Sequence, residues 1–243
     1  MATLLTLHGF LGGPNDWESL SQKLDNVTVK SVDLLTLNLS HFHSASESLL
    51  ALMDPFLDQP VFLMGYSMGG RLALDFACRY PKLLTGLILE SSSAGIEEPD
   101  ERAYRHTKDL ELAKRMQSIP WPQFVSEWYC QPLFESLRTH DHFEAMLASR
   151  NAQDPAQMAR LLKSLSIAKQ VSRWVELPHL DLPTLLITGE KDAKYCEIAH
   201  RMKQLMPKSR AVTIPHAGHN CHLENIQDMV VEIADFIMMA SAK

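Results

Sequence analysis

Short apolar runs alternate with longer amphipathic stretches through most of this chain, and that alternation restricts the possible folds more than any other feature. Apolar runs bounded by turn residues and separated by helical patterns predict parallel strands joined by helices. The predicted strands are Leu4–Leu7, Val27–Val32, Val61–Met64, Leu84–Leu89, Leu185–Ile187 and Ala211–Ile214. The predicted helices among them are Asp16–Leu24, Ser46–Leu57, Met68–Arg79 and one from Leu223 to about Met239.

The interval from residue 92 to residue 182 breaks this alternation, because it contains helical patterns and no convincing strand. Helices inserted between two strands of a parallel sheet would lie over the carboxyl ends of the strands, where open α/β sheets bind ligands. We therefore expect a core made of residues 1–91 and 183–243 and a helical cap made of residues 92–182. The helical patterns of the cap are Ala103–Met116, Pro122–Tyr129, His142–Ser149 and Pro155–Ile167.

The composition argues against several classes of function. The net charge is −6 and no basic stripe could neutralise a phosphate backbone, so we expect no nucleic-acid partner. No apolar stretch is long enough for a membrane span, and the N-terminus lacks the basic segment of a secretory signal, so we expect a cytoplasmic protein without a membrane partner. The four cysteines form no Cys-x-x-Cys pair, which argues against a structural metal site or a disulfide framework.

The strongest local motif is the segment 65–69, Gly-Tyr-Ser-Met-Gly, between the predicted strand Val61–Met64 and a predicted helix. In a nucleophile elbow, the serine occupies a sharp strand-to-helix turn, and glycines at the flanking positions let neighbouring backbone approach closely. The alternative is a serine that merely caps a helix. Because strand and helix are both in place, we interpret Ser67 as the nucleophile or base of an active site.

A serine hydroxyl is a poor base near neutral pH, so it needs an imidazole to take its proton and an acid to orient that imidazole. In the fold that carries this elbow, the α/β-hydrolase fold, the acid and then the histidine follow the serine in the chain. Asp192 follows the strand Leu185–Ile187 and is the predicted acid, with Glu190 as its competitor.

His219 follows the last predicted strand and precedes the final helix, which is the position that this chain order requires. His216 and His222 are nearby alternatives. An oxyanion hole would use the backbone N–H of Met68, after the serine, and that of Phe10 in the loop after the first strand. We interpret His8 in the same loop as structural, because the triad already has its base.

Several motifs along nearly the whole chain now point to one family. They are His-Gly-Phe-Leu-Gly at 8–12, the elbow continued to Arg71, Trp-Tyr-Cys-Gln-Pro at 128–132, Gly-Glu-Lys-Asp-Ala-Lys-Tyr at 189–195 and Ala-Gly-His-Asn at 217–220. Together they resemble the 2-succinyl-6-hydroxy-2,4-cyclohexadiene-1-carboxylate synthases of menaquinone biosynthesis. The resemblance implies a lyase that eliminates pyruvate from 2-succinyl-5-enolpyruvyl-6-hydroxy-3-cyclohexene-1-carboxylate, with the triad as the base and no metal or organic cofactor.

The resemblance also implies a small-molecule polycarboxylate as the partner of the site, bound by a monomer or a small homo-oligomer. Guanidinium groups pair with carboxylates in a bidentate fork, and Arg71 lies one helical turn past the serine, which places it toward the pocket or the cap. Matching the family motifs by position suggests Arg105 and Arg150 as further carboxylate ligands, with Tyr66 and Trp128 lining the pocket.

Two segments depart from the family pattern. The loop 33–40 reads Asp-Leu-Leu-Thr-Leu-Asn-Leu-Ser where relatives usually show Asp-Leu-Pro-Gly-His-Gly, so its contribution to the site is open. Ile226 stands where a proline is usual, which we expect to affect only the start of the last helix.

Two other functions remain open from the sequence. A carboxylesterase or a carbon–carbon bond hydrolase would share the same triad and fold, but arginines in the cap argue against an apolar acyl pocket. A binding protein without catalysis commonly loses a member of the triad, whereas this chain keeps a candidate for each.

Overall fold

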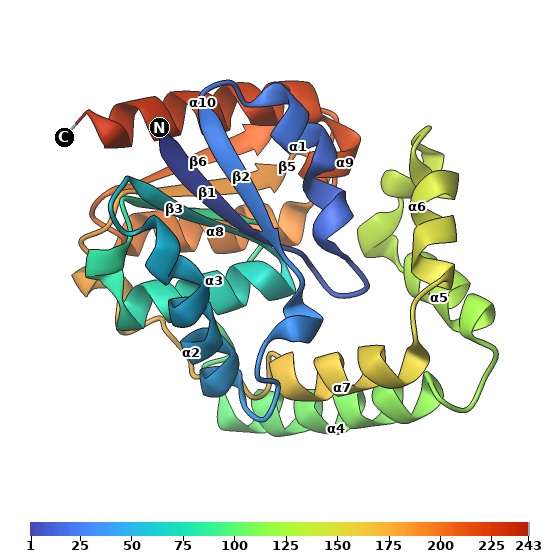
Figure 1. Ribbon diagram of the computed structural model, residues 1–243. Helices are drawn as coiled ribbons and strands as arrows, with labels where there is room; N and C mark the ends of the chain where they lie inside the picture. The colour runs from blue at the N-terminus through green and yellow to red at the C-terminus, as the bar shows by residue number, and fades with distance from the viewer. Residues whose placement is uncertain (243) are drawn as a thin grey trace.

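The computed structural model describes residues 1–242, which contain a six-stranded parallel sheet in the order β2-β1-β3-β4-β5-β6 (Figure 1). All the predicted strands are present. The apolar runs of the four central strands fit the burial of parallel strands on both faces, whereas the two edge strands are partly exposed. The strands are β1 (Ala2–Leu7), β2 (Val27–Val32), β3 (Val61–Tyr66), β4 (Gly86–Glu90), β5 (Thr184–Gly189) and β6 (Ser209–Ile214).

Helices cover both faces of the sheet (Figure 1). One face is covered by α1 and α10, where Phe62 of β3 packs edge-to-face on Phe236 with ring centroids 6.0 Å apart. Its neighbour in the strand, Leu63, points into the core on the other face with Phe76 of α3. The covering helices are α1 (Glu18–Lys23), α2 (Phe42–Met53), α3 (Met68–Arg79), α8 (Ala193–Leu205), α9 (Cys221–Glu224) and α10 (Ile226–Ser241).

The segment between β4 and β5 is helical, as the sequence predicts, and contains no strand within the described residues. Figure 1 shows α4 and α7 running alongside each other, with α5 and α6 next to one another at one end of that pair. These helices are α4 (Pro99–Arg115), α5 (Trp121–Tyr129), α6 (Phe143–Asn151) and α7 (Pro155–Leu165). No helix within residues 1–242 has the length and apolar character that crossing a bilayer would require.

The order of the strands determines where a site can form. The chain passes from β1 to β2 on one side and then returns to β3 on the other side of β1. In open α/β sheets, ligands bind at the carboxyl ends of the strands next to such a reversal. The residues that follow β1 and β3 are therefore the expected walls of the site. Short 3-10 helices connect the elements at Pro14–Trp17, Leu34–Thr36, Asp54–Phe56, Pro81–Leu83, Pro132–Phe134, Leu137–Thr139 and Leu177–His179.

Candidate active site

Ser67 occupies the sharp turn between β3 and α3, with a φ of 50°. This left-handed conformation is uncommon for a residue with a side chain, and such strain is concentrated at functional sites. A Cβ at Gly65 would clash with the backbone of Gly69, and a Cβ at Gly69 would clash with the backbone carbonyl of Leu7. The turn thus needs both glycines, as the sequence motif predicts, and it presents the serine at the start of α3.

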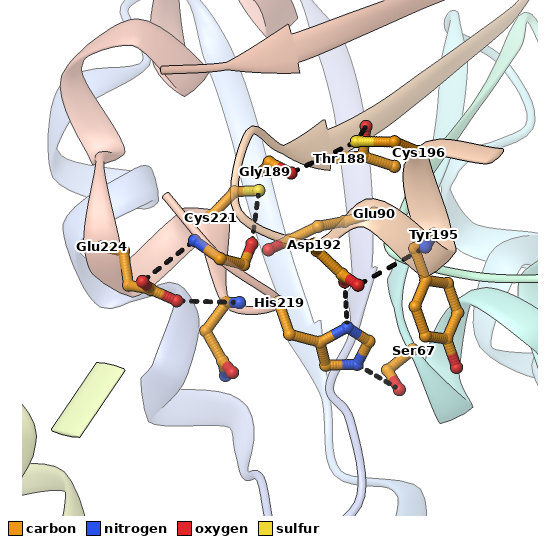
Figure 2. Close-up of polar contacts among 12 residues, drawn as sticks. Ser67, Glu90, Thr188, Gly189, Asp192, Tyr195, Cys196, His219, Cys221 and Glu224 are labelled. Carbon is orange, nitrogen blue, oxygen red and sulfur yellow. Dashed lines mark hydrogen bonds and ion pairs between the residues drawn. The ribbon is translucent and has the colours of Figure 1, made fainter. Parts of the chain in front are cut away.

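The side chains of Ser67, His219 and Asp192 come together at the carboxyl ends of β3, β5 and β6 (Figure 2). His219 Nδ1 lies 2.6 Å from Asp192 Oδ2, and His219 Nε2 lies 3.2 Å from Ser67 Oγ. Asp192 and His219 are both buried. With the ring protonated on Nδ1, His219 donates to the carboxylate and accepts the hydroxyl proton of Ser67. This geometry lets the imidazole act as a general base toward the serine.

The competing candidates lie elsewhere. The carboxylate of exposed Glu190 accepts the backbone N–H of His216, and neither residue reaches Ser67. His222 is buried against a different carboxylate, that of Glu90. His8 is structural, as predicted: its Nδ1 donates to the carbonyl of Gly9, and its Nε2 accepts the N–H of Leu34. Within residues 1–242, no three His, Cys, Asp or Glu side chains gather as a metal site requires.

The backbone around the serine supplies donors for a developing negative charge. Met68 is the first residue of α3, and the first N–H groups of a helix have no partner within the helix. Phe10 follows β1 in the loop beside the elbow, and its side chain lines the same cavity as Ser67. Within the described chain, no backbone acceptor takes the N–H of either residue. Both donors are therefore free to bind an oxyanion.

A cavity of about 420 Å³ opens beside Ser67, which is large enough for a small-molecule ligand. Arg71 and Arg105 lie on its wall together with Tyr66 and Trp128, so four of the five predicted substrate-binding residues share one cavity with Ser67 and His219. The other lining residues are Phe10, Met68, Asp109, Gln131, Leu133, Phe134, Leu162, Ser166, Ile167, Lys194, Tyr195 and His219.

Arg71 is buried on α3, one turn after the serine. Its Nη1 donates to the backbone carbonyl of Leu165 at 3.0 Å, at the end of α7. Burial lowers the pKa of Arg71 to about 10, so the guanidinium remains charged at neutral pH. Among the described residues Arg71 makes no ion pair, and a buried cation without a carboxylate partner can pair with the carboxylate of a ligand.

Arg105 on α4 is held by a buried carboxylate. Asp109 Oδ1 accepts from Arg105 Nε at 2.7 Å, and its Oδ2 accepts from the hydroxyl of Ser166 at 2.6 Å. Asp109 is thus held by Ser166 and in turn holds Arg105 through Nε. The two Nη atoms of Arg105 remain available to a ligand. The residues at the end of α7, Leu165 and Ser166, thus hold Arg71 directly and Arg105 through Asp109.

Some residues of the cavity were not singled out by the sequence. Tyr195 lies near the start of α8, and its ring centroid is 4.6 Å from that of His219 (Figure 2). Its backbone N–H points to Asp192 Oδ1 at 3.4 Å. Burial raises the pKa of Tyr195, which keeps the phenol protonated and able to donate to a ligand. The segment 189–195 contains this tyrosine, but its place beside the imidazole depends on α8, which the sequence analysis missed.

Arg150, the fifth predicted substrate-binding residue, does not lie on the wall of the cavity as the sequence analysis expects. Arg150 is buried away from the cavity, where its Nη2 pairs with Asp16 Oδ1 at 2.7 Å. Its backbone carbonyl accepts from Trp121 Nε1 at 3.0 Å. Nearby, Gln153 Nε2 donates to the carbonyls of Leu11 and Gly12. Arg150 therefore attaches the end of α6 to the segment that follows β1, instead of binding a ligand.

Replacing Arg150 should affect stability more than substrate binding. We expect Arg150→Met to lower the free energy of unfolding by about 1–3 kcal/mol, because Asp16 loses a buried partner but keeps the N–H of Gly13. Urea denaturation measures this change. The control is Arg115→Met, which removes an exposed ion pair with Glu127 and should cost no more than about 1 kcal/mol. Unchanged stability with a raised KM would restore the role in substrate binding.

The unusual loop 33–40 contributes no side chain to the cavity. It contains the short helix Leu34–Thr36, and the carbonyl of Leu39 accepts from the hydroxyl of Ser164 on α7 at 2.5 Å. The loop thus supports the cap from outside the site. Ile226 begins α10, and the side chain of Asn225 caps that helix by accepting from the N–H of Asp228.

Comparison with known proteins agrees with this geometry. Residues 2–226 match the model of the alpha/beta hydrolase fold family. The chain is 33% identical over 258 residues to Protein PHYLLO, chloroplastic, of Arabidopsis thaliana, covering 96% of this chain but only 15% of that much longer protein. It is 30% identical to 2-succinyl-6-hydroxy-2,4-cyclohexadiene-1-carboxylate synthase of Klebsiella pneumoniae (strain 342), covering 96% of this chain and 93% of that one.

A solved structure, that of MenH from S. aureus, superposes with a TM-score of 0.93 at 30% identity, over 98% of this chain and 94% of the other. Similarity at this level extends over the core and the helices between β4 and β5 alike. The chain therefore belongs to the 2-succinyl-6-hydroxy-2,4-cyclohexadiene-1-carboxylate synthase family of the α/β-hydrolase fold.

Proposed function

We propose that this protein is the lyase of menaquinone biosynthesis that converts 2-succinyl-5-enolpyruvyl-6-hydroxy-3-cyclohexene-1-carboxylate to 2-succinyl-6-hydroxy-2,4-cyclohexadiene-1-carboxylate and pyruvate. Ser67, His219 and Asp192 act as its base, and Phe10 and Met68 supply the oxyanion hole. The four cysteines form no disulfide bond, which is consistent with a location of the protein in the reducing cytoplasm.

The reaction removes a proton from the ring carbon that bears the succinyl carbonyl. Ser67 passes its own proton to His219 Nε2 and takes the proton of the substrate, while Asp192 stabilises the imidazolium. The electrons of the C–H bond form an enolate, whose oxygen the N–H groups of Phe10 and Met68 stabilise. When the carbonyl re-forms, the enolate electrons form a double bond between C2 and C3, the existing ring double bond moves from C3–C4 to C4–C5, and the bond from C5 to the enolpyruvyl oxygen breaks. The departing enolate takes up a proton and becomes pyruvate, and His219 gives up the proton that it received, which restores the neutral imidazole.

One observation carries the proposal: two guanidinium groups line the cavity that contains the triad serine. Arg71 is buried, and Arg105 is oriented by Asp109, so both present fixed positive charge to a ligand. A site for neutral esters would gain nothing from these charges and would lose apolar contact area. A substrate with several carboxylates fits these groups, since each guanidinium can take one carboxylate in a fork.

Pyruvate release tests this function. We expect the purified protein to release pyruvate from the enolpyruvyl substrate, measured by coupling to lactate dehydrogenase, and to hydrolyse p-nitrophenyl acetate far more slowly. The same preparation serves for both assays, so a misfolded sample would fail both. Fast ester hydrolysis without pyruvate release would refute the proposal and favour the carboxylesterase alternative.

Asp109 should affect substrate binding through Arg105. In Asp109→Asn, the amide can accept from Arg105 or from Ser166 but not from both, and the charge-assisted hydrogen bond to Arg105 is lost. We expect KM for the enolpyruvyl substrate to rise about tenfold, because hydrogen bonds to charged groups contribute about 1.5–3 kcal/mol. The control on the same helix is Glu111→Gln, whose exposed pair with Lys108 should leave KM unchanged.

A further inference from the structure

Glu90 and His222 form a second buried carboxylate–imidazole pair close to the triad, and the proposed chemistry does not use it. His222 Nδ1 donates to Glu90 Oε1 at 2.8 Å, and the backbone N–H of His222 donates to the same oxygen at 3.1 Å. Both side chains are almost inaccessible to solvent. Burying two ionisable groups removes their hydration, and apolar residues of similar size often stabilise a core as well or better. Core stability alone therefore does not explain the pair.

The backbone around Glu90 holds the nucleophile elbow. The N–H of Ser67 donates to the carbonyl of Glu90 at 2.9 Å, and the hydroxyl of Ser92 donates to the carbonyl of Ser67 at 3.2 Å. Ser67 and Ser91 are both in the left-handed region, with φ of 50° and 44°. Glu90 is the last residue of β4. The strained turns that follow β3 and β4 are thus joined by these two hydrogen bonds.

The other end of the pair holds the loop that carries the triad histidine. His222 lies three residues after His219 and belongs to α9. Within this loop, the carboxylate of Glu224 accepts the N–H of Gly218 at 2.9 Å and that of Asn220 at 3.2 Å. These bonds make the loop internally rigid, so a bond that fixes His222 also restrains the position of His219.

Aromatic contacts connect the pair with the triad. The ring of Tyr66 lies against both imidazoles, 5.3 Å from that of His219 and 4.7 Å from that of His222 between centroids. On its other side, His222 packs on Trp17 at 4.7 Å. Burial disfavours a charged imidazole here, but the carboxylate of Glu90 outweighs burial and raises the pKa of His222. The pair is thus an electrostatic as well as a hydrogen-bonded contact.

We propose that Glu90 is a positioning residue that sets the distance between the triad serine and histidine. Its carbonyl holds Ser67, its carboxylate holds the loop of His219, and the two together maintain the 3.2 Å separation across which the hydroxyl gives up its proton. This inference concerns the reactivity of Ser67 and applies whatever substrate the cavity accepts.

The test measures the reactivity of Ser67 directly, as the rate of inactivation by phenylmethylsulfonyl fluoride, which sulfonylates activated serines. We expect Glu90→Gln to lower this rate and the kcat for pyruvate release by about tenfold to 100-fold, because small misplacements of catalytic groups cost this much. KM should stay within about threefold, because the pair does not line the cavity.

Matched variants separate positioning from general destabilisation. His222→Asn and His222→Leu both remove the ring that packs on Trp17, but only the asparagine keeps a donor near the position of Nδ1. We expect His222→Asn to react with the reagent at least several times faster than His222→Leu. Asp75→Asn is the stability control: Asp75 is a buried carboxylate paired with Arg173 and Arg79, and its loss should lower the melting temperature without changing serine reactivity.

Several results would overturn the proposal. A folded Glu90→Gln variant with wild-type rates of inactivation and turnover would do so. If that variant does not fold, equal rates of inactivation for His222→Asn and His222→Leu would overturn the proposal. A wild-type protein that does not react with the reagent would refute the activated serine itself. Absence of pyruvate release with the expected pattern of serine reactivity would refute only the proposed substrate.

Discussion

Replacing Ser67 with alanine should reduce pyruvate release at least about 10³-fold, the largest effect that we expect from any single substitution. The hydroxyl is the group that meets the substrate proton, and His219 lies behind it and cannot take over without moving. Bound substrate would still meet Arg71 and the oxyanion donors, so KM should change little. Turnover measured with lactate dehydrogenase, together with circular dichroism to confirm folding, gives the comparison.

The serine and the histidine should behave as one unit. If they do, the double variant Ser67→Ala/His219→Ala will be no slower than the single variants, because removing either member already disables the base. Ser93→Ala is the matched control, since this buried serine has no hydrogen-bond partner for its hydroxyl within the described chain. A serine-based mechanism would be contradicted if the losses of turnover in the two single variants multiplied in the double variant. Turnover by Ser67→Ala within tenfold of wild type would also contradict it.

Arg71→Ala should give the second-largest loss, about 2–5 kcal/mol in transition-state binding, which lowers kcat/KM by about 30-fold or more. The guanidinium is buried beside Ser67 and makes no ion pair with a carboxylate within residues 1–242, so a substrate carboxylate is its natural partner. The measurement is kcat/KM for pyruvate release over a range of substrate concentrations. A raised KM with unchanged kcat would show that Arg71 binds the ground state and transition state equally.

Charge and geometry at Arg71 can be separated. Arg71→Lys keeps the charge but loses the planar fork, and we expect it to recover only part of the lost kcat/KM. Arg160→Ala is the control: Arg160 is exposed on α7, so its replacement should leave kcat/KM unchanged. If Arg71→Ala retains kcat/KM within threefold of wild type, the substrate carboxylate does not bind at this position.

The strands and the elbow could be predicted because their signals are local. The apolar runs give the sheet, and the glycines at 65 and 69 belong to one five-residue motif. A Cβ at Gly65 would meet the backbone of Gly69 within the turn, and a Cβ at Gly69 would meet the backbone of Leu7 at the end of β1. Helix α8 escaped prediction because it is mostly exposed and fully buries only Ala199 and Met202, so its apolar stripe is thin. Tyr195, which packs on His219, was missed together with that helix.

The partners of buried charges could not be predicted, because they depend on contacts between distant parts of the chain. Arg150 and Asp16 are separated by 134 residues, and Glu90 and His222 by 132. A motif can identify an arginine, but whether it meets a ligand or a carboxylate of the protein depends on how the cap packs on the core. This is why Arg71 and Arg105 line the cavity as predicted while Arg150 does not.

The most direct test of the mechanism is a crystal structure of the Ser67→Ala variant with the enolpyruvyl substrate bound. We predict that the succinyl carbonyl oxygen lies about 3 Å from the N–H groups of Phe10 and Met68, with substrate carboxylates on Arg71 and Arg105. The ring carbon that loses its proton should then face position 67. A substrate whose carbonyl points away from these N–H groups, or whose carboxylates contact neither arginine, would contradict the account.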